Sequence, residues 1–153
     1  MMKETEKIFK KMEEYLKQFN FENDEQKEIK IQEFIQKLNN DDLEINYDNP
    51  KFKSDDLLEE AYYASSKTTA IRLAKQALEI YPDNIDAECF IANFEENQIK
   101  KLKKYEVIIE KATEILKKDD MFNEENIGHF WGMVETRPYM RARNYKITIL
   151  MDL

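Results

Sequence analysis

Apolar residues recur at helical spacing along most of the chain, so their pattern predicts an all-α protein. Residues 3 to 20 predict a first helix, whose apolar face consists of Ile8, Met12, Tyr15, Leu16 and Phe19. Asn23 or Asp24 can cap a second helix, whose stripe consists of Ile31, Phe34, Ile35 and Leu38. We therefore expect residues 1–42 to form an N-terminal helical hairpin.

Four further helices are expected between residues 54 and 120. Residues 43–53 are rich in Asn and Asp, contain Pro50, and predict a linker. Ser54 or Asp55 can cap the third helix, which continues to about residue 66, and the fourth runs from about residue 68 to the residue before Pro82. Asn84 or Asp86 can open the fifth helix, and residues 99 to 118 carry the apolar stripe of a sixth.

Residues 121–153 predict a bend followed by a terminal helix. Gly128 and Gly132, the two glycines of the chain, enclose His129, Phe130 and Trp131, and are expected to let the backbone bend or a helix approach closely. Phe130 and Trp131 are most simply interpreted as core residues, and the alternative is an exposed anchor for a partner. Pro138 fits the first turn of the last helix, which continues to the final residue.

Small residues at a fixed spacing connect this pattern to a known family. The series is Ala70, Ala74, Ala77 and Pro82, and the preceding helix offers Leu57, Leu58 and Ala61. The spacing resembles that of the tetratricopeptide repeat, in which small residues let two helices of a hairpin touch. A second, degenerate repeat begins near Ile85, with Lys117 at the position where the family has proline.

Two looser similarities extend the resemblance. The segment WGMVETRPYMRAR, which starts at Trp131, resembles a segment of uncharacterised bacterial proteins with such repeats. The stretch from Thr68 to Leu78 is similar to the suppressor-of-tumorigenicity family of repeat proteins. The resemblance implies antiparallel hairpins stacked as a right-handed superhelix, with two hairpins in residues 54–120 and an incomplete repeat after them. The terminal helix would then leave an apolar face uncovered.

Composition narrows the classes of function. Asp and Glu number 32 against 24 Lys and Arg, and the net charge of -8 argues against a nucleic-acid-binding protein. One cysteine excludes an internal disulfide and fits a reducing compartment. The charged N-terminus lacks the apolar core of a signal peptide, and no stretch has the length of a membrane span. We therefore expect a cytoplasmic protein without membrane or nucleic-acid partners.

The resemblance also implies a binding surface, because the first helices of successive repeats line the concave groove in this family. By position, that groove would contain Asp55, Glu59, Tyr62, Tyr63, Asp86, Asn93, Glu96 and Asn97. Acidic groups beside aromatic rings suit a basic peptide, whereas the simpler interpretation is a solvated helix face. The expected function is a non-catalytic protein- or peptide-interaction module, or scaffold. The alternative is a structural or oligomerisation module whose terminal helix pairs with another copy or with a C-terminal domain.

Few residues are candidates for anion binding, metal binding or catalysis. Arg137 and Arg141 lie one helical turn apart and can bind an anion together, although internal pairing with acidic helices is the favoured alternative. Cys89 and His129 lack the further ligands of a metal site and the orienting group of a nucleophilic pair. With no glycine-rich phosphate loop or hydrolase motif, we expect no cofactor, no metal and no catalysis.

Overall fold

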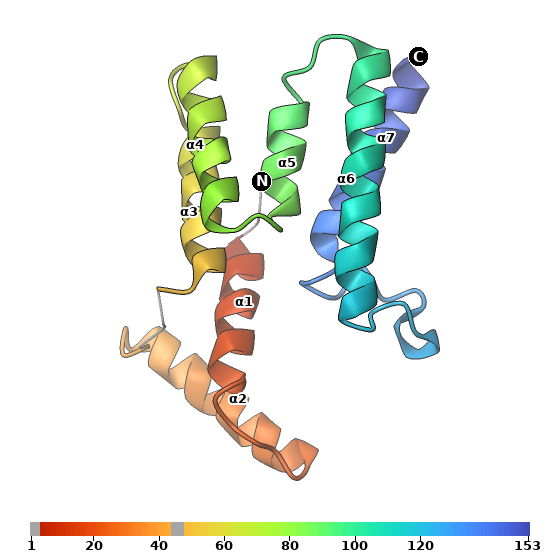
Figure 1. The fold of residues 1–153 in the computed structure, drawn as a ribbon. Helices are drawn as coiled ribbons and strands as arrows, with labels where there is room; N and C mark the ends of the chain where they lie inside the picture. The colour runs from red at the N-terminus through yellow and green to blue at the C-terminus, as the bar shows by residue number, and fades with distance from the viewer. Residues whose placement is uncertain (1–3, 44–47) are drawn as a thin grey trace. The chain divides into compact units, whose positions relative to one another are not determined.

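The protein is all-α. The computed structural model describes residues 4–43 and 48–153, and each regular element in these two ranges is a helix (Figure 1). The chain divides into two compact units, Met1–Tyr47 and Asp48–Leu153, and the boundary falls inside the predicted linker. Of the helices described, none combines the length and the hydrophobicity that crossing a membrane requires.

The first unit is a helical hairpin. Helices α1 (Glu4–Leu16) and α2 (Asp24–Asn39) pack through Tyr15, Leu16 and Phe34. The Asn23 side chain caps α2 by accepting a hydrogen bond from the Gln26 amide at 2.9 Å. Helix α1 ends before residue 20, and Ile8 and Ile35 are exposed although both were predicted to lie on apolar stripes.

The second unit is an up-and-down series of five helices. They are α3 (Pro50–Tyr62), α4 (Lys67–Ile80), α5 (Ile85–Ala92), α6 (Gln98–Lys118) and α7 (Arg137–Asp152), with a short 3-10 helix η1 (Glu124–Asn126) before α7. Figure 1 shows α4 in front of α3 and α6 in front of α7. Helix α5 packs against α4, α6 and α7, so it joins the α3/α4 pair to the α6/α7 pair.

Helix α3 begins earlier than predicted. Asn49 is its N-cap, accepting from the Lys51 amide at 2.9 Å, and Pro50 occupies the first turn. Proline is tolerated there because the amide hydrogen it lacks would have no partner within the helix. Residues 50–53 are therefore helical, and the prediction that Ser54 or Asp55 caps α3 is wrong.

The alanines of α4 are buried, as predicted. Ala74 and Ala77 are fully buried and Ala70 nearly so, in a core that includes Ala61 of α3 and Ala87 of α5. Small side chains at a helix contact allow the two axes to come close together. The predicted close contact of α4 with its neighbours α3 and α5 is therefore confirmed.

A buried polar group of residues joins α3, α4 and α5. The fully buried Ser54 hydroxyl donates to the Ala77 carbonyl at 2.8 Å and accepts from Asn84 Nδ2 at 2.8 Å. Asn84 Nδ2 also lies 3.2 Å from Asp55 Oδ1, and Asn84 Oδ1 caps α5 by accepting from the Ala87 amide at 3.0 Å. We call this set the Ser54–Asn84 junction. It fixes the start of α5 against the middle of α3 and the end of α4.

A second core lies between α5, α6 and α7. It contains Tyr105, Ile108 and Leu116 of α6, together with Ala142 and Ile149 of α7. The Tyr105 hydroxyl is 2.7 Å from Asn93 Oδ1 and 3.1 Å from the Cys89 carbonyl. Burial and these contacts anchor the end of α5 on α6.

Candidate functional site

Four residues of α3 and its C-cap were predicted to line a groove, and they lie in different environments. Asp55 takes part in the Ser54–Asn84 junction, and Glu59 is half-buried. The Tyr62 ring packs edge-on against Phe90, with the two ring centres 4.7 Å apart. Tyr63, the C-cap of α3, is 72% exposed. Of the four, Tyr63 thus presents the largest free aromatic surface.

The predicted groove residues of α5 and the following loop bond within the chain. Asp86 accepts two hydrogen bonds from Arg141, with Nε to Oδ1 at 2.8 Å and Nη2 to Oδ2 at 2.6 Å. Asn93 holds the Tyr105 hydroxyl, and Asn97 caps α6 by accepting from the Lys100 amide at 2.9 Å. Glu96 is strongly exposed and lies 4.0 Å from Lys67. Glu96 is therefore the acidic side chain of this group that remains most open to a partner.

Residues from α3, α5 and α7 meet on one surface. The pKa of Tyr62 is raised from 10.0 to about 12, first by burial and then by the nearby Tyr145 and Asp86, whereas Arg141 lowers it. Asp86 and Arg141 bond to each other directly, and Tyr62 and Tyr145 lie near enough to this pair to interact with it electrostatically, although the four side chains come from three helices. We call the surface formed by Tyr62, Asp86, Arg141 and Tyr145 the tyrosine face. Burial also raises the pKa of Tyr145.

Tyr145 was not among the residues predicted to line the groove. It follows Arg141 by one helical turn, and this spacing alone could have placed it beside the arginine.

The two arginines at the start of α7 have different partners. Arg141 is held by Asp86 in a two-pronged ion pair that fastens α7 to α5, which is the internal pairing that the sequence favoured. Arg137 Nε donates to the Trp131 carbonyl at 3.0 Å. The guanidinium groups thus hold separate parts of the unit together.

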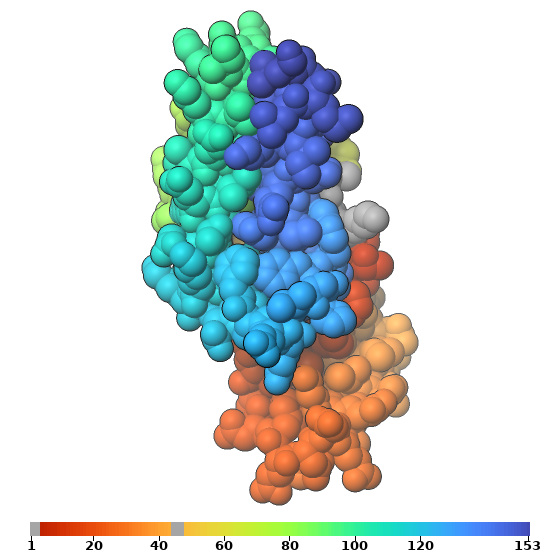
Figure 2. Space-filling model, turned by 90° about the vertical axis from the view of Figure 1, so that its right-hand side faces the viewer, coloured from red at the N-terminus to blue at the C-terminus, as the bar shows by residue number. Residues whose placement is uncertain are grey.

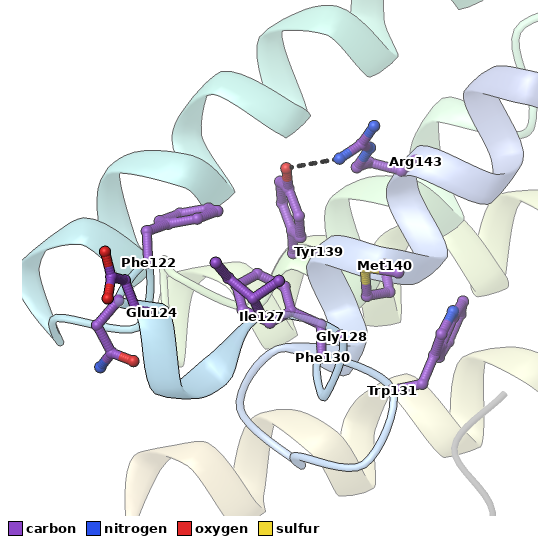
Figure 3. Close-up of a pocket in the computed structure, with 10 residues that line it drawn as sticks. Phe122, Glu124, Ile127, Gly128, Phe130, Trp131, Tyr139, Met140 and Arg143 are labelled. Atoms are coloured by element: carbon purple, nitrogen blue, oxygen red, sulfur yellow. Dashed lines mark hydrogen bonds between the residues drawn. The ribbon is translucent and has the colours of Figure 1, made fainter.

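A pocket of about 440 Å³ opens beside the start of α7. Figure 2 shows α6, α7 and, at their lower end, the loop that connects them, and Figure 3 shows the pocket in that region. The lining residues come from this loop, η1 and α7: Phe122, Asn123, Glu124, Ile127, Gly128, Phe130, Trp131, Tyr139, Met140 and Arg143. Trp131 is 52% exposed on the pocket wall, so its predicted place in the core is wrong.

Hydrogen bonds within the loop fix the pocket walls. Gly128 has a φ of +82°, in the left-handed region that favours glycine, and confirms the predicted bend. The Thr136 hydroxyl is buried and bonds the carbonyls of Phe130 and Met133. Asn126 Nδ2 donates to the Met121 carbonyl at 3.0 Å. The pocket thus has a defined backbone frame.

Two charged side chains border the pocket. Arg143 Nη1 donates to the Tyr139 hydroxyl at 3.1 Å, and its guanidinium carbon lies 5.6 Å from the centre of the Tyr139 ring. Glu124 projects from η1, on the side of the pocket away from Arg143 in Figure 3. In the described ranges, neither side chain forms an ion pair.

The single cysteine and histidine are in contrasting surroundings. Cys89 is buried on α5, and burial strongly raises the pKa of its thiol, which keeps the sulfur in its poorly nucleophilic neutral form. His129 is exposed in the loop before α7. Residues 4–43 and 48–153 contain no cluster of three or more His, Cys, Asp or Glu side chains that could hold a metal ion.

Comparisons with known proteins give no relative for this chain. No family model matches it, and searches of curated proteins and of solved structures returned no significant match.

Proposed function

We propose that the chain is a non-catalytic module that recognises a protein or peptide through the surface of α3, α5 and α7. The observation that carries this proposal is the tyrosine face, where the Arg141–Asp86 ion pair joins α7 to α5 and the Tyr62 ring of α3 packs on Phe90 of α5. The buried alanines of α4 support a stack of tetratricopeptide-like hairpins, because they allow the close helix contacts that such a stack needs. In such a stack these three helices would line the concave side.

The chemistry of the surface favours a basic segment as the partner. Tyr63 directly follows α3, Glu96 lies in the loop after α5, and both are strongly exposed, while Glu59 is half-buried on α3. A Lys or Arg side chain gains attraction both from an aromatic face and from a carboxylate. The net charge of -8 would also speed the encounter with a cationic peptide.

Not every residue that was predicted to line the groove can serve as an anchor for a partner. Asn93 supports Tyr105 and Asn97 caps α6, so replacing either one would disturb the fold as well as the surface. Tyr63 and Glu96 offer exposed groups whose removal leaves the cores intact.

A peptide selection followed by calorimetry tests the proposal. Decapeptides selected from a random library on the whole chain should be enriched in Lys and Arg. Tyr63→Ala and Glu96→Gln should each weaken the binding of a selected peptide about three- to tenfold, which corresponds to about 0.7–1.4 kcal/mol. Glu110→Gln, which removes the same charge from an exposed position on α6, should leave the affinity unchanged. Selected peptides that are acidic, or affinities insensitive to both surface changes, would contradict the proposal.

Self-association through α7 is a second candidate, favoured by a specific feature. Ile147, Leu150 and Met151 are exposed on this helix, and Met151 is 81% exposed. Exposed apolar residues on one helix often mark a contact between proteins. Sedimentation velocity should then show a dimer that dissociates in the Ile147→Glu/Met151→Glu variant. Weak dimers dissociate with a Kd of about 100 µM or less. A wild-type chain that remains monomeric at about 100 µM would therefore exclude this candidate.

A further inference from the structure

We propose that the pocket beside α7 binds a small free acid, with an aromatic or branched apolar body and one carboxylate. The site is separate from the tyrosine face and does not depend on the proposed peptide recognition. Its volume of about 440 Å³ lies within the range of roughly 300–1,000 Å³ found for small-molecule sites.

The walls of the pocket are suited to an aromatic ring. Phe122, Phe130 and Tyr139 form a set in which each ring contacts the other two, with centre-to-centre distances of 5.3, 5.8 and 6.1 Å. Ile127 is 73% exposed, and Trp131 is also largely open to water. A ring seated among these side chains would remove apolar surface from water on both itself and the protein.

Arg143 provides the site for the carboxylate. Its guanidinium carries five N–H donors, and the described residues provide one hydrogen-bond acceptor for it, the Tyr139 hydroxyl. The remaining donors can hold a carboxylate by two parallel hydrogen bonds. Tyr139 accepts from Arg143 and therefore keeps its own hydroxyl proton for a further bond.

Glu124 determines which anion fits. Its carboxylate also lines the pocket, so it disfavours further negative charge there. A monoanionic carboxylate is therefore preferred to a phosphate dianion of the same body. The same chemistry occurs at the C-terminal residue of a peptide; we assign the site to a free acid, and the comparison with a peptide below tests this choice.

A matched ligand pair tests the inference with the whole chain. 1-Naphthylacetate and its neutral analogue 1-naphthylacetamide have the same body, and each is titrated calorimetrically. The acid should bind at least tenfold more tightly than the amide. Equal affinities, or no heat from the acid at 1 mM, would overturn the proposal.

Variants at Arg143 and Glu124 show which side chain causes the preference for the acid over the amide. Arg143→Gln should make the acid and the amide bind alike, and Arg143→Lys should keep part of the preference because it retains the charge without the fork. Glu124→Gln should strengthen binding of the acid and leave binding of the amide unchanged. A preference for the acid that survives in Arg143→Gln would refute the role of Arg143, and circular dichroism checks that each variant is folded.

The source of the carboxylate is tested separately. N-Acetyltryptophan should bind as tightly as a hexapeptide that ends in tryptophan with a free carboxylate. A hexapeptide that binds more than tenfold more tightly would overturn the assignment to a free acid. The pocket experiments do not use the Tyr63 and Glu96 variants. Their outcome is therefore independent of the peptide-binding experiment described under the proposed function.

Discussion

Removing the hydroxyl of Ser54 should loosen the connection between the α3/α4 pair and α5. In Ser54→Ala the bond to the Ala77 carbonyl and the bond from Asn84 are both lost. Neither partner becomes fully unsatisfied, since the Ala77 carbonyl still accepts from the Tyr81 amide at 2.9 Å and Asn84 still reaches Asp55. With about 1 kcal/mol for each lost bond, the free energy of unfolding should fall by about 1.5–2.5 kcal/mol.

Asn84→Ala should have a larger effect. It removes the α5 cap, worth about 1 kcal/mol, and also the bonds to Ser54 and to the Asp55 carboxylate. The expected loss is about 3–4 kcal/mol, because a bond to a charged group contributes more than a neutral one. In the double variant the losses should fall short of the sum by about 1 kcal/mol, which is the energy of the shared bond.

Urea unfolding measures these changes. Trp131 is the sole tryptophan and lies in the second unit, so its fluorescence reports on that unit, while circular dichroism follows the whole chain. Ser65→Ala, at an exposed position between α3 and α4, is the matched control and should change stability by less than about 0.5 kcal/mol. If Ser54→Ala behaves like this control, or if the two junction changes are simply additive, the Ser54–Asn84 junction does not stabilise the unit as described.

Three other predictions follow from particular contacts. Ala74→Leu should lower the free energy of unfolding by about 1–3 kcal/mol, because no space exists for a larger side chain at the α4 contact; an unchanged thermal midpoint would contradict the packing. Gly128→Ala should lower the free energy of unfolding by about 1–2 kcal/mol, because an alanine at this positive φ is strained; an unchanged urea midpoint would contradict this. Since the pKa of Tyr62 rises from 10.0 in its unperturbed form to about 12, its stabilising contribution is complete below pH 10 and is lost as pH increases through 12. Urea unfolding between pH 10 and 12 should therefore show falling stability, with a smaller fall in Tyr62→Phe; equal falls in both proteins would exclude Tyr62 as a source.

The helices were predictable where one local signal dominates. The spacing of Ala70, Ala74 and Ala77 indicated a close helix contact, and these residues are indeed buried. The start of α3 was predicted wrongly because Pro50 was taken as part of a linker, although proline also fits a first helical turn. The role of Ser54 depends on Asn84, thirty residues later, and local patterns carry no information about such a pairing.

The site was less predictable because it is assembled from distant segments. Internal pairing of Arg141 was anticipated, but its partner Asp86 lies 55 residues away and could not be named from the sequence. Trp131 was assigned to the core on hydrophobicity alone, which measures a preference for burial and not the presence of a covering element. The two glycines did indicate a bend, and the pocket lies at that bend.

The most direct test of the proposed function is to map where a bound peptide lies. An isotope-labelled sample of the whole chain is titrated with a Lys- and Arg-rich decapeptide while the backbone amide resonances are followed. The largest shifts should cluster on α3, α5 and α7 around Tyr63, Asp86 and Tyr145. Shifts confined to α1 and α2, or to the loop between α6 and α7, would contradict the proposed function.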